Sequence, residues 1–197
     1  MIAWAMNGEA LRPAQGYPAR LVVPGWEGNM WVKWIRRLEF GDKPYMTREE
    51  TSKYTDLLRD GKARMFTWVM EAKSVVTSPS PEKPILHKGI QQLRGLAWSG
   101  KGKIKRVDVS LDGGKNWRTA QLHAPIMSKS LVRFTLPFEW SGEELLIQSR
   151  AIDETGYVQP YIQELQKIRG KNSIYHNNSI ATWLVSKSGK VDNVRLG

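Results

Sequence analysis

The chain of 197 residues contains no cysteine. From its own residues it therefore cannot form a disulfide, a thiolate metal site or a cysteine nucleophile. No stretch approaches the roughly 18 uninterrupted apolar residues of a membrane-spanning helix, and the opening MIAWAMNGEA lacks the basic and long apolar segments of a signal peptide. These absences exclude thiol chemistry within the chain and predict that it has no membrane span.

Positive charge, in contrast, is abundant. The 30 Lys and Arg residues outnumber the 19 Asp and Glu residues, which gives a formal net charge of +11. Such a charge favours anionic substrates, acidic protein partners or nucleic acid without choosing among them. The nine tryptophans are compatible with nucleic-acid binding, but most lie in apolar runs (AW, VKW, TWV and TWL), where core packing explains them. We therefore expect no nucleic-acid partner.

The character of the chain changes near residue 78. Residues 7–41 hold short apolar runs separated by Pro and Gly, which is typical of strands and tight connections. Thr47 followed by Glu50 fits a capping box and favours a short helix there, although a polar surface loop is the alternative. The proline-rich stretch EAKSVVTSPSPEKP then indicates a linker. We expect two domains, residues 1–78 and 79–197.

The second segment has the pattern of a β-sandwich. In IKRVDVSL, apolar and polar residues alternate from residue 107 onward, which predicts a strand with one buried face. Gly113 and Gly114 in DGGKNW can adopt the positive φ that short hairpin turns require. Several such strands predict an antiparallel sandwich of about 100 residues. The basic residues of the SGKGKIKR stretch, from Lys101 to Arg106, are expected to face solvent or a partner.

Three motifs, AWSG, RVDVSLDGGKNW and AIDETGYVQP, together resemble the C-terminal dimerisation domain of the sulfite oxidase family of molybdenum enzymes. Upstream, MNG, GYP, VVPG and VKW follow one another as at the end of that family's molybdopterin-binding domain. RGKNSIYHNNSIATWLV is similar to the sulfane dehydrogenase branch. The resemblance implies a mainly β fold, with an immunoglobulin-like antiparallel β-sandwich in residues 79–197 preceded by the C-terminal part of an α+β molybdopterin-binding domain.

The same resemblance implies a chemistry. Enzymes of this family hold molybdenum through a pterin dithiolene and a cysteine thiolate, oxidise sulfite or protein-bound sulfane sulfur by oxygen transfer, and pass electrons to cytochrome c. It also implies a homodimer, a sulfur-carrier protein as a further partner, and a periplasmic location.

Since the chain has no cysteine, we expect it to be the C-terminal portion of such an enzyme, with a truncated start at Met1. Alone it is expected to be inactive, with no bound metal or cofactor. The alternative is a non-catalytic, immunoglobulin-like dimerisation or interaction module.

Three residues match functional positions of the family. Lys33 in VKW corresponds to a lysine that contacts the pterin cofactor, where a compact charge with three donors suits an anion. Tyr54 in SKYTD corresponds to the active-site tyrosine, although its neighbours Lys53 and Thr55 depart from the family motif. Arg169 in KIRG corresponds to an arginine that binds the anionic substrate. The alternatives are a solvent-facing lysine, a half-buried loop tyrosine and a surface arginine.

Other polar residues are expected to be structural. His176 is followed by two asparagines, which is poor spacing for metal ligands, so we expect it to form a structural hydrogen bond. Asp108, Asp112 and Asp153 are typical of strands and turns, where carboxylates accept backbone N–H bonds. The sequence thus predicts no metal site formed by these residues.

Overall fold

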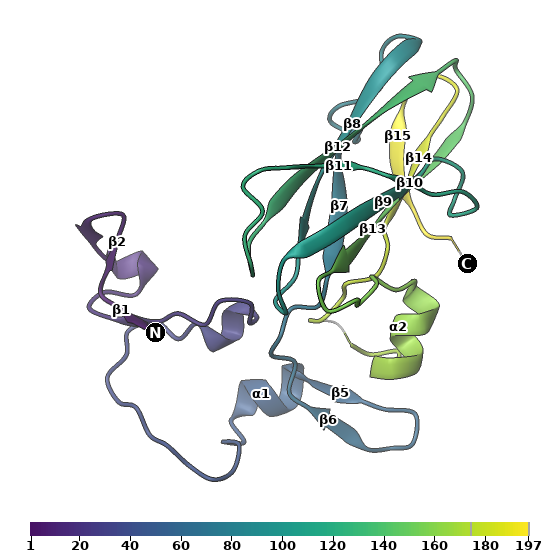
Figure 1. Ribbon diagram of the computed structural model, residues 1–197. Coiled ribbons are helices and arrows are strands. Elements are labelled where there is room, and N and C mark those ends of the chain that lie inside the picture. The colour runs from purple at the N-terminus through teal and green to yellow at the C-terminus, as the bar shows by residue number, and fades with distance from the viewer. Residues whose placement is uncertain (174, 197) are drawn as a thin grey trace. The chain divides into compact units, whose positions relative to one another are not determined.

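The computed structural model describes residues 1–173 and 175–196, and the chain divides into two compact units. The first unit comprises Met1–Met70 together with Arg169–His176. The second unit comprises Glu71–Ile168 and the chain from Asn177 onward. The chain therefore leaves the first unit, forms most of the second, returns to the first for one short segment, and ends in the second (Figure 1).

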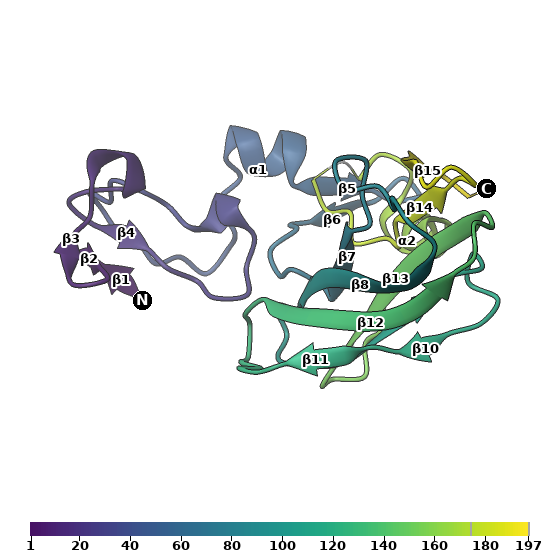
Figure 2. The ribbon, with the colours of Figure 1, turned by 90° about the horizontal axis from the view of Figure 1, so that it is seen from above.

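The second unit is a sandwich of two antiparallel sheets (Figures 1 and 2). The four-stranded sheet has the order β11-β12-β8-β7, and the five-stranded sheet has the order β10-β9-β13-β14-β15. Both the mainly β fold and the antiparallel pairing confirm the prediction from sequence. The strands are β7 (Lys73–Ser78), β8 (Gly89–Trp98), β9 (Ile104–Ser110), β10 (Arg118–Thr119), β11 (Gln121–His123), β12 (Val132–Trp140), β13 (Leu145–Asp153), β14 (Thr182–Val185) and β15 (Val191–Val194).

Alternating residues of the strands build the core of the sandwich. Along β12 every second side chain, from Val132 to Trp140, is at most 5% exposed. Phe134 lies opposite Gly95 of β8, and a Cβ on this glycine would lie 2.1 Å from the phenyl ring. A period of two along a strand thus places a continuous apolar layer between the sheets.

Strand β9 is buried more completely than the sequence predicted. Val107 and Val109 are inaccessible, as expected for the core face, but Asp108 and Ser110 of the other face are also at most 4% exposed. Arg150 covers Asp108 through an ion pair at 3.4 Å, and Ser110 donates a hydrogen bond into the following loop. Polar partners, not an apolar layer, therefore cover the outer face of this strand.

The units divide between residues 70 and 71, earlier than the domain boundary expected near residue 78. The reason is that β7 pairs with β8, and Ala72 and Val76 belong to the core of the sandwich. The prolines of this stretch follow the strand, beginning at Pro79. The segment expected to be a linker therefore contributes an edge strand.

The first unit consists of short elements. Its helix α1 begins at Arg48, directly after Thr47, so the predicted helix is present although the Thr47 side chain forms no capping bond. Within the described residues of this unit, Leu11 is the only buried apolar side chain. The elements are β1 (Ile2–Ala3), β2 (Ala5–Met6), β3 (Glu9–Ala10), β4 (Arg20–Leu21), α1 (Arg48–Lys53), β5 (Thr55–Leu57), β6 (Ala63–Met65) and two 3-10 turns, Pro13–Gln15 and Gly28–Met30.

Helix α2 (Ile162–Arg169) ends where the chain returns to the first unit. Across the part of the chain that the structure describes, no helix has the length and apolarity needed to cross a membrane.

Candidate functional site

Arg169 is buried beside strand β5 of the first unit. Its Nη1 donates a hydrogen bond to Asp56 Oδ2 at 3.0 Å, and both side chains are 4% exposed. The next residue, Gly170, has φ of +79°, and a Cβ there would lie 2.1 Å from the Leu57 carbonyl oxygen. Glycine is therefore required at this position, because it lets the backbone approach β5 and brings Arg169 to Asp56.

The burial of Arg169 excludes the alternative of a surface arginine, because its side chain is only 4% exposed. A guanidinium buried in this way needs a partner that offsets its loss of hydration. Asp56 is such a partner, and it fixes the orientation of the guanidinium fork. Since Asp56 also balances part of the charge, direct binding of a substrate anion by Arg169 remains a proposal.

Tyr54 directly precedes β5. Its ring lies against the ring of Tyr175, with centroids 5.0 Å apart and planes inclined by 46°. Burial raises the pKa of the Tyr54 phenol above its usual value, with further contributions from Tyr175 and from the charge of Glu27. The phenol is therefore neutral at physiological pH and has an O–H that can donate a hydrogen bond.

The sequence did not predict the partner of His176. The His176 Nδ1 and Glu27 Oε1 atoms lie 2.6 Å apart, and the imidazole is 4% exposed. Glu27 is anchored through its backbone N–H, which donates to the Trp68 carbonyl at 2.6 Å. The structural hydrogen bond expected for His176 is thus present. Within the described residues no three histidine, aspartate or glutamate side chains are grouped as a metal site would need.

Lys33 is exposed, which agrees with the alternative of a solvent-facing lysine. Its ammonium donates to the Ala14 carbonyl at 2.8 Å and lies 5.3 Å from the centroid of the Trp34 ring. Its Cβ packs against Gly16, where an added Cβ would lie 3.0 Å away. Tyr54 and the Asp56–Arg169 pair are gathered around β5, whereas the contacts of Lys33 are with the residue 14–34 region.

The aspartates of the sandwich divide into two groups. Asp112 and Asp153 accept loop N–H groups, as predicted, and for Asp112 the bonds from Asn116 hold the pKa of the carboxyl well below its usual range. Asp108 differs from the prediction, because its oxygens pair with the side chains of Arg106 and Arg150. The two guanidinium groups and the Thr119 hydroxyl, and not backbone N–H groups, satisfy that carboxylate.

The tryptophans also separate into two groups. Trp140 is 3% exposed, and Trp26 and Trp68 stack with centroids 5.2 Å apart, so packing explains them. Trp4 and Trp34, however, are 72% and 55% exposed, which corrects the expectation that their apolar runs are buried. Both rings belong to the first unit, where Leu11 is the one buried apolar side chain among the described residues.

Family comparisons agree with the two-part architecture. Residues 64–183 match the Mo-co oxidoreductase dimerisation domain, and residues 1–49 match the oxidoreductase molybdopterin binding domain. The chain therefore belongs to the sulfite oxidase family of molybdenum-cofactor oxidoreductases.

Within this family, individual proteins differ in their similarity to the chain. The crystal structure of the sulfane dehydrogenase SoxCD from Paracoccus pantotrophus is 63% identical with a TM-score of 0.94, and the match covers 100% of this chain and 51% of that one. Sulfite oxidase from Gallus gallus is 34% identical over 174 residues, which are 81% of this chain and 38% of the relative. A nitrate reductase from Mycosarcoma maydis is 32% identical over 64% of this chain and 15% of its own length. The chain thus spans about half or less of these relatives, and it is more similar to SoxCD than to the sulfite oxidase.

Proposed function

We propose that the chain provides the C-terminal part of a molybdenum-cofactor enzyme that oxidises protein-bound sulfane sulfur or sulfite and passes the electrons to cytochrome c. The observation that supports this proposal is the 63% identity to the sulfane dehydrogenase SoxCD across the whole chain. The proposal includes a homodimer formed through the sandwich, a sulfur-carrier protein as substrate carrier, and a periplasmic location.

The two units take different parts in this proposal. The first unit is assigned to the end of the molybdopterin-binding domain, and the sandwich to the dimerisation domain. The boundary expected at residue 78 lies at the end of β7, so the sandwich begins with this strand.

The chain has a residue that suits an anionic pterin cofactor but lacks the ligand that would suit the metal. Lys33 uses one of its three donors on the Ala14 carbonyl and exposes the rest, which fits the phosphate of a molybdopterin. The sequence has no cysteine, so a thiolate for molybdenum would come from outside these residues. When bound, the cofactor supplies oxygen transfer to sulfur and accepts two electrons.

The roles of the chain's own residues follow from their surroundings. The neutral phenol of Tyr54 donates a hydrogen bond from its Oη to an oxygen of the substrate and can exchange that proton as charge changes there. Arg169 attracts the oxyanion, while Asp56 holds the guanidinium in one orientation and limits its net charge. Glu27 and His176 hold the backbone segment that also carries Tyr175.

The proposal is tested by purifying the molybdenum-loaded enzyme from its host and measuring reduction of cytochrome c with sulfite and with a sulfane-loaded carrier protein. Tyr54→Phe is expected to lower kcat by about 10²-fold with little change in KM, because only the proton donor is lost. Arg169→Gln should chiefly raise KM. Lys187→Gln, an exposed turn variant, serves as the control. Failure of both substrates to reduce cytochrome c would contradict the proposed reaction.

A second candidate function is that of a non-catalytic dimerisation module, favoured by the match of residues 64–183 to a dimerisation domain. The isolated chain is then expected to be a dimer without molybdenum. Light scattering and elemental analysis measure the two properties. A strict monomer at micromolar concentration would exclude the module, and stoichiometric molybdenum would exclude the inactive state.

A further inference from the structure

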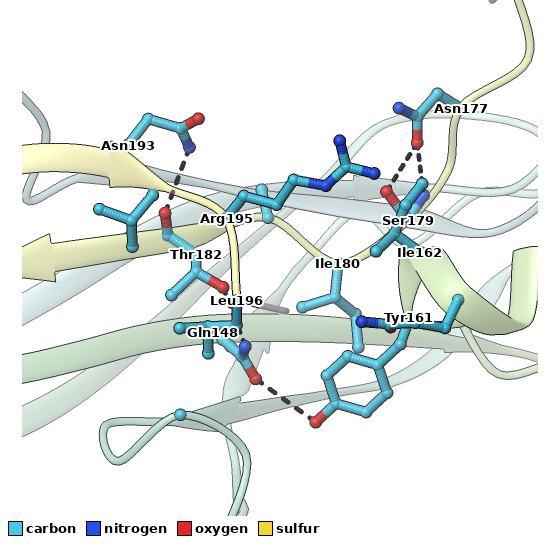
Figure 3. Close-up of a pocket in the computed structure, with 14 residues that line it drawn as sticks. Gln148, Tyr161, Ile162, Asn177, Ser179, Ile180, Thr182, Asn193, Arg195 and Leu196 are labelled. Carbon is cyan, nitrogen blue, oxygen red and sulfur yellow. Dashed lines mark hydrogen bonds between the residues drawn. The ribbon is translucent and has the colours of Figure 1, made fainter. Parts of the chain in front are cut away.

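A pocket of about 530 Å³ lies on the outer face of the five-stranded sheet (Figure 3). Gln148 of β13 follows the core residue Ile147 and therefore points to the opposite face of the sheet. Thr182 of β14 lies directly across from Gln148 in the ladder. These two residues form the polar floor of the pocket, and residues from the start of α2 and the end of β15 form its walls.

Hydrogen bonds fix the orientation of this floor. Gln148 Nε2 donates to Thr182 Oγ1 at 2.9 Å, and Tyr161 Oη donates to Gln148 Oε1 at 3.4 Å. Gly114 makes room for the tyrosine, since a Cβ on this residue would lie 2.2 Å from Tyr161 Oη. Because the buried amide is bonded at both ends, the floor is preformed and does not need to rearrange when a ligand enters.

The side chains that line the pocket carry one positive charge. Arg195 is the only ionisable acid or base other than Tyr161 among the described lining residues. Two carboxylates close to the lining residues in the sequence have partners of their own: Glu164 accepts the Tyr161 backbone N–H at 3.3 Å, and Asp192 pairs with Lys190 at 3.0 Å. In the described part of the chain, Arg195 itself forms no ion pair, so its guanidinium can pair with an anion.

The walls of the pocket combine a charged group with apolar surface, so one ligand could place a charged end and an apolar end in the same pocket. Figure 3 shows the Arg195 side chain extending from the end of β15 toward Ser179 and Asn177. Ile180 and Leu196 contribute apolar surface to the same pocket. The volume lies in the range of about 300 to 1,000 Å³ typical of small-molecule sites, which also combine apolar walls with a few polar groups.

We propose that this pocket binds a small organic carboxylate. The carboxylate pairs with the guanidinium of Arg195, and the apolar body of the ligand packs against Ile180 and Leu196. One guanidinium and no carboxylate among the described lining residues match a ligand with a single negative charge. This site lies in the sandwich and uses none of the residues around β5, so it goes beyond the function proposed above.

Benzoate is a suitable probe, because it combines one carboxylate with an apolar ring. Titrated into the ¹⁵N-labelled chain, it is expected to give saturable shifts of the Gly113 and Ala181 amide signals, which belong to lining residues. Arg195→Gln should weaken binding at least about tenfold, because the charge-assisted pair is lost. Lys187→Gln removes one positive charge from an exposed turn outside the pocket and should leave the affinity unchanged.

Two further probes separate charge from shape. Benzamide has the shape of benzoate without its charge, and sulfate has charge without an apolar body, so both should bind more weakly than benzoate. Equal binding of benzoate to the wild type and to Arg195→Gln would overturn the proposal, as would the absence of saturable shifts. Sulfate binding as tightly as benzoate would overturn the assignment to an organic ligand.

Discussion

The two units of the chain are stabilised by different interactions. In the sandwich, a continuous cluster of buried apolar side chains lies between two sheets. In the described residues of the first unit, Leu11 alone is apolar and fully buried, while four polar residues are buried there: Asp56, Thr67, Arg169 and His176. Buried ion pairs and hydrogen bonds therefore position the Asp56–Arg169 pair and its surroundings, whereas in the sandwich pairs such as Asp108–Arg150 add to an extensive apolar core.

The largest effect should come from the sandwich core. Phe134→Ala removes an inaccessible ring and is expected to lower the free energy of unfolding by about 3–5 kcal/mol, because it leaves a cavity. Phe40→Ala, in the first unit, removes a ring that is 96% exposed and should change the free energy of unfolding by less than about 0.5 kcal/mol. Urea unfolding followed by circular dichroism measures both. Similar effects of the two variants would contradict the contrast between the units.

The next effect tests the buried pair of the first unit. Asp56→Leu leaves the Arg169 guanidinium without its carboxylate partner, at an expected cost of about 3 kcal/mol. The double variant Asp56→Leu with Arg169→Met removes both charges and should recover most of that loss. Amide hydrogen exchange at Thr55 and Leu57 in β5 reports the local stability. If the double variant were as unstable as the single one, packing and not charge would hold this strand.

The smallest effect concerns the phenol of Tyr54. Its raised pKa means that the neutral form is favoured in the fold, so this contribution to stability is full below about pH 10 and is lost as pH rises through the folded pKa. Glu27→Gln should lower the pKa of Tyr54 only in part, because burial is the larger cause. Phenolate absorbance, with Tyr54→Phe subtracted, measures the change. An unchanged pKa would show that Glu27 does not act on Tyr54.

Local sequence patterns predicted the sandwich well. The alternation from residue 107 onward repeats within a few residues, and Gly113 and Gly114 do adopt positive φ at 75° and 92°. The same reasoning assigned the stretch that holds β7 to a linker, because prolines follow this strand directly. It also explained most tryptophans by core packing, although Trp4 and Trp34 are exposed, since an apolar run does not reveal whether other residues cover it.

The polar pairs of the first unit could not be predicted from local sequence patterns. Asp56 and Arg169 are 113 residues apart in the sequence, and Glu27 and His176 are 149 apart. Nothing near Glu27 in PGWEGN distinguishes it from an exposed turn residue. Resemblance to a family indicated Arg169 and Tyr54, but their partners became visible only once the fold had brought distant segments together.

The return of Arg169–His176 to the first unit also has a consequence for the order of events during synthesis. A ribosome releases Met1–Met70 before the sandwich, yet Asp56 and Glu27 in that stretch must wait for partners that follow nearly the whole sandwich. Most of the sandwich strands are available earlier, since β7 to β13 precede Arg169. We therefore expect the scaffold to begin folding before the first unit is complete, so that the residues proposed to act on substrate acquire their final surroundings last.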